Sequence, residues 1–338
     1  MLGIDSLPEL LLARGEYASE VYARADALRR QVFGDRVHLR ALIELSNYCS
    51  KNCFYCGIRR DARAVMRYIL PGEEILELAR CIAKGPCRTL VLQSGESDVF
   101  GDEALARLIR RIREETGLAI TLSCGVRPRE VYAAWREAGM DRYLLRFETS
   151  DPELYARLHP DSTLDERLLA LQELRSLGVQ IGSGFLIGVP GETLEILAQN
   201  ILLCRSLRLD MIGIGPFIPH PDTPLAGEQN VWSADHEQFF AAVAALRLYN
   251  PRAYIPATTA FDTLFGVGGR LRLLRYGANV YMPNFTPKQY SASYALYPGK
   301  APGMRVDGDD LAFLCRQIEG LGLSLAQDAG HALAADIE

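Results

Sequence analysis

The chain lacks the features that would place it in a membrane or direct it out of the cell. No stretch of about 18 uncharged apolar residues occurs, so we expect no transmembrane helix. The first residues, from Met1 to Asp5, contain no basic segment followed by an apolar core, so we expect no secretory signal. A location in the cytoplasm is therefore expected.

The chain also lacks a block of lysines and arginines with interleaved aromatic residues, and its net charge is −5. Nucleic acid is therefore not expected as the main partner. There is no low-complexity linker. The composition, 49% hydrophobic and 23% charged over 338 residues, is that of a soluble globular protein. This length fits either two domains or one large α/β barrel.

Eight cysteines are present, and three of them share one short loop. Cys49, Cys53 and Cys56 have the spacing C-x3-C-x2-C. Thiolates are suitable ligands for iron–sulfur clusters, and three of them can hold three corners of a 4Fe–4S cube. A site with three protein ligands leaves one iron open to a substrate or cofactor. The loop therefore predicts a catalytic iron–sulfur centre.

A structural zinc site is the simpler alternative for these cysteines. Zinc usually takes a fourth Cys or His at short spacing, and the nearest candidates, His38 and Cys81, do not have that spacing. Without a signal peptide, the remaining cysteines are expected to be reduced. We interpret Cys81, Cys87, Cys204 and Cys315 as small buried hydrophobic residues in or beside helices and strands.

Strand and helix patterns alternate along almost the whole chain, which indicates a parallel sheet. Eight such units predict a (β/α)8 barrel. We expect an N-terminal helical extension over 1–34, the barrel over 35–300 and a C-terminal helical extension over 301–338. The expected strands are 37–45, 89–93, 118–122, 142–146, 180–186, 211–215, 253–257 and 278–282, and the expected helices are 9–30, 73–83, 102–115, 128–138, 151–158, 164–176, 192–206, 235–248 and 268–275.

Polar residues gather where the predicted strands end. The cysteine loop follows the first strand, and the others come at or just after the ends of strands two, three, four and seven. In a barrel these carboxyl ends meet at one rim, where active sites are built. The residues at this rim are Ser94, Gly95, Glu96, Ser123, Glu148, Thr258 and Thr259.

A C-x3-C-x2-C loop after the first strand of such a barrel resembles the radical S-adenosylmethionine (radical SAM) enzymes. Within them the chain is most similar to the maturases of FeFe-hydrogenase, a group related to biotin synthase and methylornithine synthase. The resemblance implies one 4Fe–4S cluster on Cys49, Cys53 and Cys56, and a 5′-deoxyadenosyl radical made from S-adenosylmethionine. The stretches that carry it are 45–53, 91–96, 141–149, 213–224, 255–260 and 282–287.

The resemblance also implies which residues contact the cofactor. Tyr55 is expected beside the cluster or the adenine, and the Ser94-Gly95-Glu96 turn beside the methionine ammonium. Ser123 and Glu148 match cofactor-contacting positions, and Arg167 matches a basic residue that faces the cofactor carboxylate. The alternative for Glu148 and Arg167 is that they form surface ion pairs. We interpret 188–192 (Gly-Val-Pro-Gly-Glu) as a turn into a helix.

At the substrate end the resemblance implies an anionic ligand. Arg146, expected to point into the barrel from the fourth strand, would be costly to bury without an anionic partner. Thr258 and Thr259 are expected to offer hydroxyl and backbone N–H donors to the same ligand. Met282 and Tyr297 are candidates for lining that cavity. For His220, a substrate contact and a role in stabilising a turn remain equally open.

The leading hypothesis is assembly of the di-iron subcluster of FeFe-hydrogenase. The resemblance implies a small organometallic substrate, an iron with CO, cyanide and cysteine. It would come from a tyrosine-cleaving maturase, and its product would pass to a scaffold maturase. A ferredoxin or flavodoxin would supply electrons. A second cluster is not expected, because only Cys315 lies beyond residue 301.

Three alternatives remain. A methylornithine synthase-like mutase, acting on an amino-acid-derived substrate, would require carboxylates for two amines. Biotin synthase would require cysteines on several strands, and only Cys124 lies near a strand end. A non-catalytic iron–sulfur carrier would not require the polar residues gathered at the barrel rim.

Overall fold

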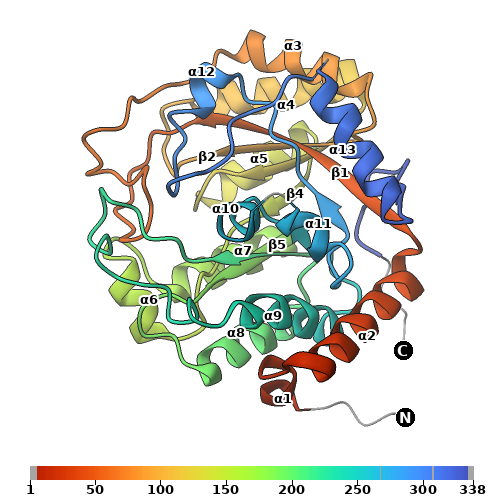
Figure 1. Ribbon diagram of the computed structural model, residues 1–338. Helices are drawn as coiled ribbons and strands as arrows, with labels where there is room; N and C mark the ends of the chain where they lie inside the picture. Colours follow the sequence, from red (N-terminus) through yellow and green to blue (C-terminus); the bar gives the residue numbers. More distant parts are fainter. Residues whose placement is uncertain (1–5, 267, 307, 334–338) are drawn as a thin grey trace.

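The computed structural model describes residues 6–266, 268–306 and 308–333, and it forms a parallel barrel (Figure 1). Its strands follow the order β6-β5-β4-β3-β2-β1-β8-β7, and a bridge between Met211 and Tyr254 joins the two ends. The predicted (β/α)8 barrel is therefore confirmed. The strands are β1 Arg36–Ser46, β2 Thr89–Ser94, β3 Ala119–Ser123, β4 Met140–Leu144, β5 Gln180–Ile187, β6 Met211–Pro216, β7 Pro256–Ala257 and β8 Val280–Tyr281.

Helices surround the strands, and the cysteine loop extends to the left of Figure 1, away from α2 and α13. Within the described residues, no helix is both long and apolar enough to cross a membrane. The helices are α1 Leu7–Leu11, α2 Gly15–Phe33, α3 Gly72–Ala83, α4 Asp102–Thr116, α5 Arg129–Ala138, α6 Pro152–Leu158, α7 Leu164–Ser176, α8 Leu194–Ser206, α9 His236–Tyr249, α10 Ala260–Phe265, α11 Gly269–Leu273, α12 Lys288–Ser291 and α13 Asp309–Gly320.

The first predicted helix is two helices in the structure, so the prediction of one helix over 9–30 was wrong. Arg14, which lies between α1 and α2, has an extended backbone with φ of −139°. Its guanidinium donates hydrogen bonds to the carbonyl oxygens of Leu11 and Ala13 and forms an ion pair with Asp235. These contacts stabilise the break between α1 and α2. Helical periodicity in the sequence does not reveal them.

The late elements also differ from the prediction. Strands β7 and β8 contain two residues each, shorter than the expected 253–257 and 278–282. Pro256 has no N–H to donate to a neighbouring strand, which limits regular pairing in β7. Short helices α10 and α12 were not predicted. Neither was β9 (Ser324–Leu325), which pairs with the first residues of β1.

Alternation along β1 separates the helix-facing core from the barrel interior. Leu39, Ala41 and Ile43 belong to the large apolar cluster that the surrounding helices cover. Side chains of a strand alternate between two faces, so Arg40 and Glu44 point to the inside of the barrel. Glu44 is fully buried there and forms an ion pair with Lys300 at 2.6 Å. The interior therefore contains charged groups that are paired or held by backbone oxygens.

The predicted turn at 188–192 contains a buried carboxylate, that of Glu192. Glu192 is 6% exposed, and its Oε2 accepts hydrogen bonds from the backbone N–H of Gly188 at 2.6 Å and from Trp232 Nε1 at 2.7 Å. Its other oxygen, Oε1, has no hydrogen-bond partner. Burial, only partly offset by these two donors, raises the pKa of the Glu192 carboxyl to about 8.

We expect Glu192→Gln to flatten the pH dependence of stability. With a folded-state pKa of about 8, Glu192 keeps a proton that the unfolded chain releases at its ordinary, lower pKa. Stability therefore falls as the pH rises between these two values, and above pH 8 this group causes no further change. In urea unfolding, the free energy of unfolding of the variant relative to the parent should rise by about 3 kcal/mol from pH 6 to pH 9.

The matched control is Glu195→Gln, an exposed residue in the first turn of α8. It should leave the pH profile of the parent unchanged. Parallel profiles for the parent and Glu192→Gln would contradict the raised pKa.

Candidate iron–sulfur and cofactor site

The cysteine loop begins where β1 ends and rests on the residues that follow β2. Gly95 lies so close to it that a Cβ atom there would be 2.2 Å from the carbonyl oxygen of Tyr48 and 2.9 Å from Cys49 Cβ. The backbone N–H of Ser50 donates to the carbonyl oxygen of Glu96 at 2.7 Å. Only glycine permits this approach, so Gly95 positions the backbone of the loop.

The side chains of Arg67 and Asn47 hydrogen-bond to the backbone of the loop and hold its parts together. The guanidinium of Arg67 donates hydrogen bonds to the carbonyl oxygens of Asn47, Ile58, Arg59 and Ala62. The side chain of Asn47 donates to the carbonyl oxygen of Met66 at 2.8 Å and accepts from the N–H of Tyr68 at 2.8 Å. A guanidinium has five N–H donors in a fixed plane, which suits it to gathering several carbonyls at once. Arg67 therefore fixes the path of the chain around the three cysteines.

The three thiols lie close enough to interact electrostatically, and each cysteine is partly buried. Burial raises the pKa of the Cys53 thiol to about 12, and the neighbouring Cys49 contributes to the rise. Burial also raises the pKa of Cys49 and of Cys56. The free thiols are therefore neutral, and a metal must displace their protons to bind thiolates.

In the part of the chain that the structure describes, no three His, Cys, Asp or Glu side chains are grouped so that they could hold one metal ion. Four ligands of one zinc ion all lie about 2.3 Å from the metal. The ligands of a four-iron cluster each bind a different iron and so stand farther apart. The donor set, three thiols without a fourth Cys or His, fits a cluster with one open iron.

Glu96 connects the cysteine loop to a helix across the rim. Its Oε1 lies 3.3 Å from Lys51 Nζ, and its Oε2 lies 3.5 Å from Arg167 Nη2. Arg167 is on α7, which begins with a capping box formed by Thr163 and Glu166. Gly125 makes room for this carboxylate, because a Cβ atom there would be 2.1 Å from Glu96 Cγ. The sequence analysis missed Gly125, although it follows Ser123 at the end of β3.

Arg146 and Glu148 lie just past the end of β4. Strand β4 ends at Leu144, two residues before the expected end at Arg146, and Glu148 pairs with Phe185 of β5 as an isolated bridge. Glu148 has φ of +65°, a backbone conformation that non-glycine residues rarely adopt. Its backbone pairs with β5 through Gly184 and Leu186, and these bonds hold the strained conformation. The bend brings the charged side chains of Arg146 and Glu148 next to each other.

Several charged atoms of this site are buried without a hydrogen-bond partner. Arg146 Nη2 and Glu148 Oε2 are 3.0 Å apart but do not have hydrogen-bond geometry. Glu96 Oε2 and Arg146 Nε likewise have no hydrogen-bond partner. Burial raises the pKa of the Glu148 carboxyl, against the opposing charges of Arg146 and Arg167. Unsatisfied buried charges are costly, so these atoms fit a site that a polar ligand completes.

Tyr55 is fixed beside the cysteines by His159. Burial lowers the pKa of His159 to about 3, so its ring is neutral. Its Nδ1–H donates to the carbonyl oxygen of Tyr155 at 3.1 Å, which leaves Nε2 to accept from the Tyr55 hydroxyl at 2.9 Å. The Tyr55 ring packs with Leu154, Leu158, Val189 and Phe217. This apolar wall next to Cys56 suits a flat heteroaromatic ring.

The two serines predicted at the rim lie where expected along the strands. Ser94 is the last residue of β2, and its hydroxyl donates to the carbonyl oxygen of Gly95 at 2.8 Å. Ser123 is the last residue of β3 and is partly buried. Residues 93 and 123 are register partners of these two strands. Both serines therefore lie on the same rim as Glu96.

The two threonines follow β7, but their hydroxyls are already engaged. Thr258 Oγ1 donates to the carbonyl oxygen of Ile214 at 2.8 Å, and Thr259 Oγ1 lies 2.6 Å from the hydroxyl of Tyr297. The expectation that the Thr258 hydroxyl is a free donor was therefore wrong, and it can only accept a further hydrogen bond. The carbonyl oxygen of Met282 accepts from Arg270 at 3.0 Å.

His220 takes part in a turn and also touches the cysteine loop. Its Nδ1 accepts from the backbone N–H of Asp222 at 3.1 Å, and its carbonyl oxygen accepts from Thr223 Oγ1 at 2.8 Å. A Cβ atom on Gly57 would be 2.6 Å from the His220 ring. His220 therefore packs directly on the residue that follows Cys56. Of the other cysteines, Cys87 and Cys204 are buried as predicted, whereas Cys81 and Cys315 are only partly buried.

Comparison with known proteins shows similarity to one superfamily and to individual proteins. The model of the Radical SAM superfamily matches residues 43–204. The chain is 44% identical over 310 residues to the [FeFe] hydrogenase maturase subunit HydE of Thermotoga maritima, which covers 92% of this chain and 88% of that protein. It is 27% identical to 3-methylornithine synthase of Methanosarcina acetivorans, over 97% of this chain and 91% of that protein.

The fold is also similar to a solved structure. The crystal structure of methylornithine synthase (PylB) matches with a TM-score of 0.81 and 26% sequence identity, over 95% of this chain and 93% of that one. The similarity therefore extends over nearly the whole chain.

We expect Arg67→Gln to weaken iron binding without unfolding the barrel. Glutamine cannot reach four carbonyls, and each lost charge-assisted hydrogen bond costs about 1.5–3 kcal/mol, so after anaerobic reconstitution and desalting the variant should retain roughly half of the parent's iron or less. Arg63→Gln is the control, because it removes an exposed charge from the same loop. Equal iron content in parent and Arg67→Gln, with unchanged circular dichroism, would show that Arg67 does not hold the loop.

Proposed function

This chain belongs to the radical SAM superfamily and, within it, to the family of the hydrogenase maturase HydE, and on that premise we propose that it acts in assembly of the di-iron subcluster of FeFe-hydrogenase. The chain is a radical SAM enzyme. The observation that carries the finer proposal is the 44% identity to HydE over 92% of the chain. We propose a small organometallic substrate, an iron with CO, cyanide and cysteine.

We propose that Cys49, Cys53 and Cys56 hold a 4Fe–4S cluster by three thiolates. When bound, the reduced cluster and S-adenosylmethionine supply a 5′-deoxyadenosyl radical. Burial favours the neutral thiol at each cysteine, so these residues would lose their protons to solvent only when the metal binds. The loop is held in place by Arg67.

We propose that the partnerless charged atoms of the rim bind the cofactor. The Ser94-Gly95-Glu96 turn would hold the ammonium of the methionine moiety, for which Glu96 Oε2 is free to accept. Arg167 would face the carboxylate, with Ser123 beside it. Glu148 Oε2 would accept from a hydroxyl or the ammonium, and Tyr55 would pack against the adenine.

Arg146 supports an anionic substrate. Its guanidinium has a carboxylate neighbour in Glu148, yet Nε and Nη2 have no hydrogen-bond acceptor. An anion such as a carboxylate or cyanide ligand would satisfy these donors in the fork geometry that arginine favours. We propose that Arg146 positions the substrate, with Thr258 accepting a hydrogen bond and Thr259 acting through its contact with Tyr297.

A methylornithine synthase-like mutase is the second candidate. The fold similarity to PylB, with a TM-score of 0.81, supports it. Such an enzyme would need carboxylates for two amines, and the partnerless carboxylate oxygens at this rim belong to Glu96 and Glu148, which we propose for the cofactor. The N–H groups of Arg146 that lack an acceptor favour the anionic substrate.

The proposal includes other proteins of the pathway. A tyrosine-cleaving maturase would supply the substrate, a scaffold maturase would receive the product, and a ferredoxin or flavodoxin would reduce the cluster.

We expect the reconstituted protein to bind about four irons per chain and, when dithionite reduces it with S-adenosylmethionine, to release 5′-deoxyadenosine. The measurements are iron analysis and chromatography of the products. Bound zinc in place of iron, with no cleavage, would contradict the proposal. 5′-Deoxyadenosine formation that only lysine stimulates would favour the mutase.

We expect Arg146→Gln to separate cofactor cleavage from maturation. Loss of a fork-shaped cation that holds an anion should lower hydrogenase activity in an in vitro maturation assay by tenfold or more, since hydrogen bonds between charged groups contribute about 1.5–3 kcal/mol. Formation of 5′-deoxyadenosine with dithionite should persist. Arg110→Gln, which alters an exposed arginine on α4, is the control. Full maturation by Arg146→Gln would remove Arg146 from the substrate site.

A further inference from the structure

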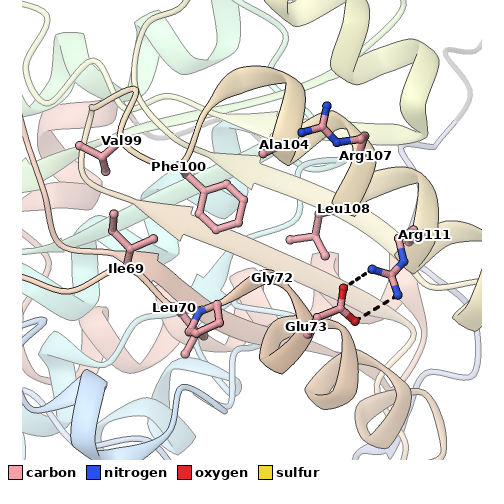
Figure 2. Close-up of a pocket in the computed structure, with 11 residues that line it drawn as sticks. Ile69, Leu70, Gly72, Glu73, Val99, Phe100, Ala104, Arg107, Leu108 and Arg111 are labelled. Atoms are coloured by element: carbon pink, nitrogen blue, oxygen red, sulfur yellow. Dashed lines mark hydrogen bonds and ion pairs between the residues drawn. The ribbon is translucent and has the colours of Figure 1, made fainter.

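The two sides of β1 near its end differ in character, and only the inner side is charged. On the outer side, Leu70 and Phe100 lie in an apolar groove of about 400 Å³ (Figure 2). The N–H of Leu70 donates to the carbonyl oxygen of Leu45 at 2.7 Å, so this groove adjoins the outer side of the strand. Side chains alternate along a strand, so Glu44 points the opposite way, into the barrel. A partner for Glu44 must therefore reach it from the interior or the mouth of the barrel.

One segment, residues 293–300, reaches Glu44 from the mouth of the barrel. It contains no helix or strand, and Lys300 is its only charged residue. The Lys300 ammonium lies 2.6 Å from Glu44 Oε1 and 5.3 Å from the centre of the Tyr294 ring. The side chains of Lys300 and Glu44 are only 8% and 1% exposed. Removing one partner of a pair that is buried in this way is strongly destabilising.

The same segment contacts the cysteine loop. The backbone N–H of Gly57, which follows Cys56, donates to the carbonyl oxygen of Leu296 at 2.9 Å. The side chain of Asn47, which precedes the first of the three cysteines by two residues, donates to the carbonyl oxygen of Ser293 at 2.7 Å. The segment therefore lies against both ends of the loop that carries the cysteines.

On its other side the segment contacts two further strand ends. Gln93, next to the end of β2, donates from Nε2 to the hydroxyl of Tyr294 at 3.3 Å. The hydroxyl of Tyr297 lies 2.6 Å from that of Thr259, which follows β7. Contacts at the ends of β1, β2 and β7 place the segment across the rim, between the cysteines and the proposed substrate end.

The segment is fixed at its two ends and held in the middle by long side chains. Helix α12 precedes it, and just beyond it the N–H of Met304 donates to the carbonyl oxygen of Asn284 at 2.7 Å. Between these ends, Tyr294, Tyr297 and Lys300 contact the barrel with the tips of their side chains. A segment without regular structure that is held in this way can open locally while the barrel stays folded.

We propose that residues 293–300 form a lid over the mouth of the barrel and that the Glu44–Lys300 ion pair is its latch. An open lid would admit substrate, and a closed lid would exclude water from the radical chemistry beneath it. The inference goes beyond the proposed function, because it does not depend on which substrate enters.

The latch acts through the cost of an unpaired buried charge. Burial raises the pKa of the Glu44 carboxyl, and the charge of Lys300 is the largest opposing effect. Without Lys300, the closed lid would cover a carboxylate that is unpaired or has to take up a proton. In both cases the closed form loses stability relative to an open form in which water solvates Glu44.

The test measures hydrogen exchange by mass spectrometry on the reconstituted full-length protein. The variants are Lys300→Met, Glu44→Gln and the double variant Glu44→Gln/Lys300→Met. The control is Lys288→Met, which alters an exposed lysine of α12 just before the lid. Peptides that contain Gly57 or residues 293–300 report on the lid, and peptides from β3 and β4 report on the barrel. A second readout is the rate at which EDTA bleaches the cluster absorbance.

We expect exchange at Gly57 and at 293–300 to be about tenfold faster in Lys300→Met and in Glu44→Gln, because each leaves one buried charge unpaired. The double variant should exchange more slowly than Lys300→Met, since no unpaired charge remains under its closed lid. Bleaching by EDTA should follow the same order. Exchange in β3 and β4 should match the parent in every variant, and Lys288→Met should match it throughout.

Unchanged exchange at Gly57 and at 293–300 in the single variants would overturn the lid. Faster exchange that extends equally to β3 and β4 would also overturn it, because the pair would then only stabilise the fold. If one single variant does not fold, the other decides. A double variant that exchanges as fast as Lys300→Met would overturn the latch. A parent that makes no 5′-deoxyadenosine would contradict the proposed function, and its hydrogen exchange would still decide the lid.

Discussion

The site depends on a guanidinium that binds backbone rather than a carboxylate. Arg67 gathers four carbonyl oxygens from the segment between Asn47 and Ala62, and these bonds give the cysteine loop one path through space. A loop has no ladder of its own to satisfy its carbonyls, so an arginine supplies the missing donors. The positive charge remains uncompensated by a carboxylate and lies close enough to Cys49 to favour its thiolate. One side chain thus shapes the loop and favours the charge state that a metal requires.

At the rim beside the loop, by contrast, cations face carboxylates. Glu96 and Glu148 stand against Lys51, Arg146 and Arg167, but several of their atoms have no hydrogen-bond partner. A protein can hold such a set only when the surrounding backbone fixes it, because each unsatisfied buried atom costs free energy. Here Gly125 leaves the space, and the bonds of Glu148 to β5 hold its positive φ. The strained backbone and the unsatisfied polar atoms therefore occur at the same place. This is expected at a binding site, which a fold maintains at a cost in folding free energy.

Sequence patterns located the parallel strands well, because a buried strand followed by a helix is a local and repeated signal. They also placed the cysteines, Ser94, Glu96 and Ser123 at strand ends, where a barrel brings distant segments together. What they could not give depends on contacts between segments. The break at Arg14 requires Asp235, more than two hundred residues away. The engaged hydroxyl of Thr258 requires the carbonyl of Ile214 from the neighbouring strand, and the positive φ of Glu148 depends on bonds to β5.

The cations around the cysteines have different roles. The cations of 47–69 are not spread evenly over a protein that is acidic as a whole. Arg67 points inward and binds the loop, Arg59 binds Asn52 within it at 2.6 Å, and Arg63 remains exposed. A buried anionic cluster would be costly in an acidic environment, so cations near it offset that cost whether or not they touch it. The need to stabilise an anionic cluster therefore favours the excess of arginine in this segment.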